Sequence, residues 1–154
     1  MSNEHTVKSY EEELRYLIDS VIKMGSLTET QLVDSMDAVI KVDKDSIDKI
    51  IKSDDEINKF RSKIDTQIMT LLVKRAPMAI DLRETISSLK ISQDLERIGD
   101  LSKSNAKKVK PLPLDLPEEL LGNLKRLGEL VIKQLNDVLA VSYTHLRAHE
   151  TRLN

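Results

Sequence analysis

The sequence of 154 residues contains no cysteine. Disulfide bonds and thiolate metal sites are therefore excluded, and a reducing compartment fits this composition. No run of about 18 consecutive apolar residues occurs, so we expect no membrane-spanning helix. The N-terminal residues are acidic and polar, with no basic start followed by an apolar run, so we do not expect them to form a secretory signal peptide.

Aromatic side chains are also scarce, at 3% of the sequence, with no tryptophan and one phenylalanine. No basic stripe is interleaved with aromatics and the formal net charge is −2, so nucleic acid is not expected as a partner. The chain is 40% hydrophobic and 32% charged, and Ile, Leu, Lys, Asp and Glu dominate. This mixture is typical of long helices rather than sheets and predicts an all-α fold.

Apolar residues that recur at spacings of three and four predict four helices. The expected helices cover residues 6–42, 45–74, 78–109 and 118–140. The first three would form an antiparallel three-helix bundle, residues 1–110, and the proline-rich residues 111–117 a stiff linker. The fourth has a full apolar face that no later segment covers, so we interpret it as the first helix of a second, truncated bundle. Such a face predicts self-association.

The second and third predicted helices supply the expected core of this bundle. The second carries Ile and Leu in a seven-residue pattern that only Asp54 and Arg61 break. The apolar side of the third comprises Ile80, Leu82, Ile86, Leu89, Leu95, Ile98 and Leu101. An unpaired buried carboxylate is costly, so Asp54 needs a partner. We favour Arg61 or an arginine of the third helix, and the alternative is a metal ion shared with Glu96 and Asp100.

Glu96 and Asp100 stand four residues apart, so their side chains share one helix face and can converge on one cation. Hard oxygen ligands suit Mg, Mn, Ca or iron. From the spacing alone, a solvated charged face with Arg97 and Lys103 as neighbours is the favoured alternative. We expect both carboxylates on the outside of the bundle within reach of Asp54. Neither a Gly-rich phosphate loop nor a Ser/His/Asp set occurs, so no catalysis is expected.

The last residues, 141–154, are interpreted separately. VSYTHLRAHET, residues 141–151, resembles a translation of the transposase adapter used in short-read sequencing libraries. The spacing of His145 and His149 would suit a zinc site on a helix. We favour adapter read-through, which would make residues 141–154 a non-native tail.

Three stretches together resemble the PhoU family of phosphate-transport accessory regulators. They are HTVKSYEEEL at residues 5–14, KRAPMAIDLRETISSLK at 74–90 and DLERIGDLSKSNAKKV at 94–109. The resemblance extends over residues 5–140 and implies two tandem three-helix bundles. This chain would hold the first bundle and the first helix of the second.

The resemblance also implies a divalent metal or iron cluster as cofactor. The family's Glu/Asp-x-x-x-Asp motif falls on Glu96 and Asp100, and its companion in the second helix falls on Asp54 and Asn58. Here Asn58 replaces the second carboxylate. The family's asparagine, four residues after Asp100, is Ser104 in this sequence.

By the same resemblance the protein is a cytoplasmic, non-enzymatic regulator of phosphate uptake and phosphate-starvation signalling, and a homodimer. Its implied partners are the ATPase subunit of the phosphate ABC transporter and a sensor histidine kinase. The polar surface around Arg83, Glu84, Arg97 and Asp100 would be the docking or metal face. The alternative is a generic helical-bundle scaffold with neither a metal nor a transporter partner.

Overall fold

The computed structural model describes residues 2–75 and 79–152, with side chains over residues 9–74 and 82–144. Within these ranges all regular structure is helical: α1 (Ser2–Lys41), α2 (Ile47–Arg75), α3 (Ala79–Lys108) and α4 (Glu118–Arg152). The all-α prediction is confirmed. α4 continues past the expected end at Ala140, because residues 141–152 contain neither proline nor glycine. The side chains of His145 and His149 lie outside the described residues, and the adapter interpretation stays a prediction.

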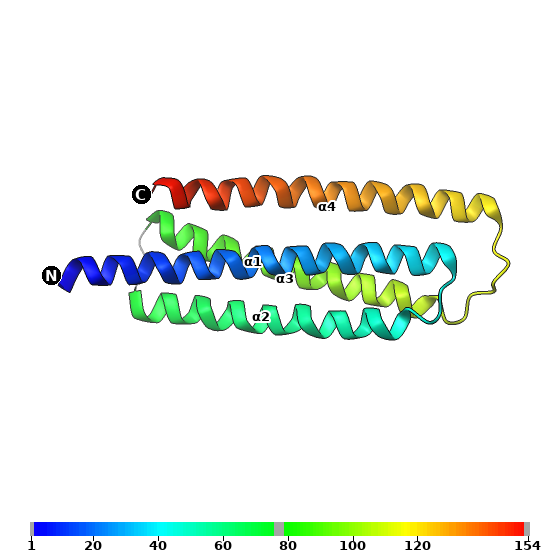
Figure 1. Ribbon diagram of the computed structural model, residues 1–154, viewed down its shortest axis with the longest axis horizontal. Helices are drawn as coiled ribbons and strands as arrows, with labels where there is room; N and C mark the ends of the chain where they lie inside the picture. Colours follow the sequence, from blue (N-terminus) through cyan, green and yellow to red (C-terminus); the bar gives the residue numbers. More distant parts are fainter. Residues whose placement is uncertain (1, 76–78, 153–154) are drawn as a thin grey trace.

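The first three helices pack against one another in alternating directions, and α4 returns along α1 (Figure 1). Within the part of the chain that the structure describes, the backbone of α4 comes close to α1 but not to α2 or α3. Leu139 and Tyr143 of α4 lie over Gly25 of α1, and Tyr143 Oη donates a hydrogen bond to the carbonyl of Ile22 at 3.1 Å. α4 is therefore a single helix that packs on α1 of the three-helix bundle.

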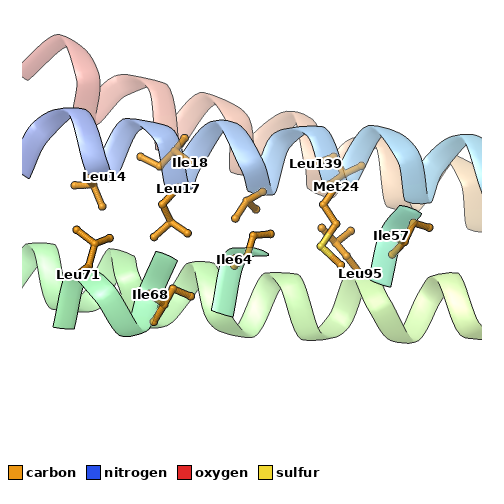
Figure 2. Close-up of a cluster of buried hydrophobic side chains, with 11 residues drawn as sticks. Leu14, Leu17, Ile18, Met24, Ile57, Ile64, Ile68, Leu71, Leu95 and Leu139 are labelled. Atoms are coloured by element: carbon orange, nitrogen blue, oxygen red, sulfur yellow. The ribbon is translucent and has the colours of Figure 1, made fainter. Parts of the chain in front are cut away.

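Large apolar side chains of α1 and α2 fill the core, joined by Leu95 of α3 and Leu139 of α4 (Figure 2). The buried members are Leu14, Leu17, Ile18, Val21, Met24, Ile57, Ile64, Ile68, Leu71, Leu95 and Leu139. Ile57 and Ile64 are fully buried, as the seven-residue pattern predicts. α2 thus presents its isoleucine seam to the centre of the bundle.

The predicted core side of α3 is wrong in several places. Leu82, Ile86 and Leu101 are 40%, 36% and 58% exposed. The residues that α3 buries are mostly small and recur at spacings of three and four. They are Thr85, Ser88, Ser92, Leu95, Gly99, Ser102 and Ala106, and the buried Val109 directly after the helix continues the series. Ile80 lies outside the described side chains.

Two of the small hydroxyl residues on this buried side of α3 satisfy their polar groups within the helix itself. Ser92 Oγ donates to the carbonyl of Leu89, and Ser102 Oγ donates to the carbonyl of Ile98, each at 2.8 Å. Neither hydroxyl then needs a partner from another helix. α3 can approach α1 and α2 closely at low cost, and this brings its polar residues near Asp54.

Candidate functional site

A polar cluster joins α1, α2 and α3 at the position where Asp54 interrupts the isoleucine seam. The Asp54 carboxylate accepts hydrogen bonds from Gln31 Nε2 and Asn58 Nδ2, both at 3.2 Å, and from Lys103 Nζ. Gln31 Nε2 also donates to the carbonyl of Gly99 at 2.9 Å. We call Gln31, Asp54, Asn58 and Lys103 the Asp54 cluster. Since its members come from all three helices, the cluster links these helices through hydrogen bonds.

Lys103 is the charge partner of Asp54, so the expected arginine partner is wrong. Arg61 forms ion pairs with Asp65 and with Glu96, where its Nε lies 3.4 Å from Oε2. Arg61 stands seven residues beyond Asp54, which is about 10 Å along the helix axis. Arg61 therefore lies opposite a part of α3 that is further along the bundle axis from the part that Asp54 faces.

Lys103 lies between a buried and an exposed carboxylate. Its Nζ contacts Asp54, whose side chain is 2% exposed, and lies 2.9 Å from Asp100 Oδ1 on the surface. The Lys103 side chain itself is 23% exposed. Its hydrogen bond to Asp54, and next that to Asp100, raise the pKa of Lys103 above the ordinary lysine value. The ammonium form is thus favoured in the folded protein.

Gly99 permits the close approach of α3 to α2 beside this cluster. A Cβ at this position would lie 3.2 Å from Ile57 Cδ1 and 3.4 Å from Asp54 Oδ1. The first distance is tighter than an ordinary van der Waals contact. The absence of a side chain at Gly99 therefore helps to bring Lys103 within reach of Asp54.

The predicted metal ligands take different positions around this cluster. Glu96 and Asp100 lie on the outside of the bundle, as expected, with side chains 41% and 57% exposed. Asp100 is linked to Asp54 through Lys103, whereas Glu96 pairs with Arg61. In the described parts of the chain, no three carboxylate or histidine side chains form a group that could hold a metal ion.

The Asp54 cluster as arranged does not fit a metal ion. Lys103 already places a positive charge between Asp54 and Asp100. Asn58 turns its NH₂ group toward Asp54, and a metal would require an oxygen atom. Metal binding by Glu96, Asp100, Asp54 and Asn58 stays a prediction.

The predicted docking residues lie on or beside the side of α3 that faces away from the core. Arg83 and Arg97 are exposed, and Glu84 is half-buried at the edge of this side. Ile86 and Leu101 are exposed along it as well. The sequence pattern assigned Ile86 and Leu101 to the core, so the apolar part of this surface was not predicted.

The bundle, its internal ion pair and the exposed side of α3 define an all-helical protein that presents a mixed charged and apolar helix surface. No described helix is long and apolar enough to cross a lipid bilayer. The PhoU domain family model matches residues 21–109, which is more than half of the chain. The chain belongs to the PhoU domain family.

Individual relatives agree with this assignment. The chain is 37% identical over 142 residues to a phosphate-specific transport system accessory protein PhoU homolog of Rhizobium meliloti (strain 1021), covering 92% of this chain and 60% of the relative. A homolog of the same description from Caulobacter vibrioides (strain NA1000 / CB15N) is 38% identical over 137 residues, covering 88% of this chain and 60% of the relative. The chain thus spans about 60% of the length of these relatives.

A solved structure shows the same fold. The phosphate transport system regulatory protein PhoU from Streptococcus pneumoniae superposes with a TM-score of 0.76 at 32% sequence identity. The match covers 85% of this chain and 61% of the solved chain. The arrangement of helices described above is therefore the fold of this family.

Proposed function

We propose that this chain takes part in regulating phosphate uptake and phosphate-starvation signalling. It would act in the cytoplasm, without catalysis, by contact with the ATPase subunit of a phosphate ABC transporter and with a sensor histidine kinase. Membership of the PhoU domain family carries the proposal. Relatives described as accessory proteins of a phosphate-specific transport system support it.

The outward side of α3 is the docking surface that we propose. Arg83, Ile86, Lys90, Arg97 and Leu101 follow one another at spacings of three, four and seven, so they share one side of the helix. All five are exposed. The stripe runs for about 27 Å along the helix at 1.5 Å per residue. Arginine beside exposed apolar side chains is typical of the residues that dominate protein interfaces.

A charge-reversal pair tests this surface. Arg83→Glu with Arg97→Glu should weaken binding of the transporter ATPase subunit about tenfold or more, while helicity stays unchanged. The matched control is Lys52→Glu with Lys59→Glu, two exposed lysines seven residues apart on α2. Binding would be measured with purified ATPase subunit. Equal loss in both variants would point to net charge rather than to this surface.

The scaffold alternative gives a different result in the same assay. A generic helical scaffold would bind neither the ATPase subunit nor the histidine kinase, whatever the state of α3. If the wild-type chain bound neither protein, the regulatory proposal would be refuted. Wild-type binding that only the α3 variant loses would support both the function and the docking surface.

We also propose a homodimer as the assembly. Leu127, Leu130 and Val138 of α4 are 58%, 55% and 61% exposed. Apolar side chains grouped in this way favour burial against another surface. A second copy of α4 offers the same apolar side chains in return.

A further inference from the structure

Two carboxylates from different helices converge on one cation that the chain itself supplies. Asp54 of α2 is buried and Asp100 of α3 is exposed, and both bond to the ammonium of Lys103. Opposite charges within hydrogen-bond distance lower the cost of burying a carboxylate. Lys103 therefore supplies the positive charge that lowers the cost of burying Asp54, as a bound cation would.

We infer that Lys103 takes the place of a metal ion between Asp54 and Asp100, so that this bundle folds and presents α3 without metal. A lysine ammonium is a compact point charge on a flexible stem, and it can enter a carboxylate pair much as a small cation does. A divalent ion would have to displace it from both oxygens. The two cations would otherwise repel each other at short range.

The remaining donors around Asp54 support this inference. The NH₂ groups of Gln31 and Asn58 both point at the Asp54 carboxylate. NH₂ groups in this orientation stabilise the charged carboxylate by hydrogen bonds, whereas metal coordination would require amide oxygens. Gln31 is held in that orientation by its second hydrogen bond, to the carbonyl of Gly99. The cluster is thus arranged around a carboxylate–ammonium pair.

Lys103→Ala tests the inference, because it removes the charge and opens space for a hydrated ion. Lys107→Ala is the matched control, since Lys107 is exposed one turn later on the same helix. Thermal unfolding would be followed by circular dichroism in EDTA and in Mn²⁺. Bound Mn²⁺ would be counted from the loss of the free-ion signal in electron paramagnetic resonance.

For the wild-type chain and K107A we expect the same midpoint in EDTA and Mn²⁺, and no stoichiometric Mn²⁺ binding. K103A should have a lower midpoint in EDTA, should bind Mn²⁺ once the Asn58 amide turns its oxygen toward the ion, and should regain stability with it. Adding Asp54→Asn to K103A should abolish that gain. If K103A is unfolded in EDTA, recovery of helicity in Mn²⁺ has the same meaning.

Two results would overturn the inference. The first is a wild-type chain that loses stability in EDTA, or binds stoichiometric Mn²⁺ through Asp54 and Asp100. The second is a K103A chain that neither binds Mn²⁺ nor gains stability or helicity from it. The wild-type measurements decide the first point even if no variant folds.

Discussion

Removing the ammonium of Lys103 should destabilise the bundle more than neutralising Asp54. The asymmetry follows from exposure, since the Asp54 side chain is 2% exposed and that of Lys103 is 23% exposed. Lys103→Met leaves a buried carboxylate with amide donors alone, and breaking a buried pair in this way costs about 3–5 kcal/mol. Asp54→Asn leaves Lys103 partly hydrated and still paired with Asp100, so we expect about 1–2 kcal/mol.

Urea unfolding followed by circular dichroism measures these differences in the free energy of unfolding. The thermal midpoint of Lys103→Met should fall by roughly 6–20 °C, at about 2–4 °C per kcal/mol for a chain of this size. The double variant should cost less than the sum of the two single changes, because the first removes the interaction that the second would break. Lys107→Met, on an exposed part of α3, is the control for loss of a lysine charge.

Two outcomes would refute this reasoning. One is a Lys103→Met variant as stable as Lys107→Met, which would mean that Asp54 does not depend on Lys103. The other is strict additivity in the double variant, which would mean that the two charges do not interact. A larger loss for Asp54→Asn than for Lys103→Met would also contradict the argument from exposure.

Three further predictions concern Lys103, Gln31 and the exposed apolar side chains of α4. Because the pKa of Lys103 is raised in the folded chain, its contribution to stability is complete below pH 10.5 and is lost as the pH rises through the folded-state pKa. The difference in unfolding free energy between wild type and Lys103→Met should therefore shrink above pH 10.5. Gln31→Leu removes the NH₂ group that donates to both Asp54 and the carbonyl of Gly99, and it should lower the free energy of unfolding in urea by about 1–3 kcal/mol. A loss of stability as small as that of an exposed substitution would contradict this. Sedimentation should show self-association of the wild type that Leu130→Lys with Val138→Lys reduces, and a monomeric wild type at high concentration would argue against the α4 surface.

Local periodicity was sufficient to predict the helices and the seam of α2. Ile57 and Ile64 are buried where the seven-residue pattern puts them, and Asp54 and Arg61 occupy the interrupting positions. This works because side chains three, four and seven residues apart share a helix face whatever the neighbouring helices do. Glu96 and Asp100 lie on the outside of the bundle as predicted, but Glu96 pairs with Arg61 instead of lying beside Asp54.

Two features depended on how the helices pack. α3 buries Ser92, Ser102 and Gly99 and exposes Leu101, which is opposite to the order of hydrophobicity. Close approach of helices favours small side chains, and hydroxyls bonded to their own backbone lose little on burial. Sequence periodicity weighted by hydrophobicity therefore places Leu95 correctly in the core but assigns the exposed Ile86 and Leu101 to it as well.

The partner of Asp54 is the second such feature. Arg61 and Lys103 both carry the right charge, and no spacing along the chain distinguishes them. The choice depends on the axial register and rotation of α3 against α2, which is fixed where Gly99 meets Ile57. Charge pairs between helices form at the level where the backbones bring them together, and that level is a property of the packed bundle rather than of any single helix.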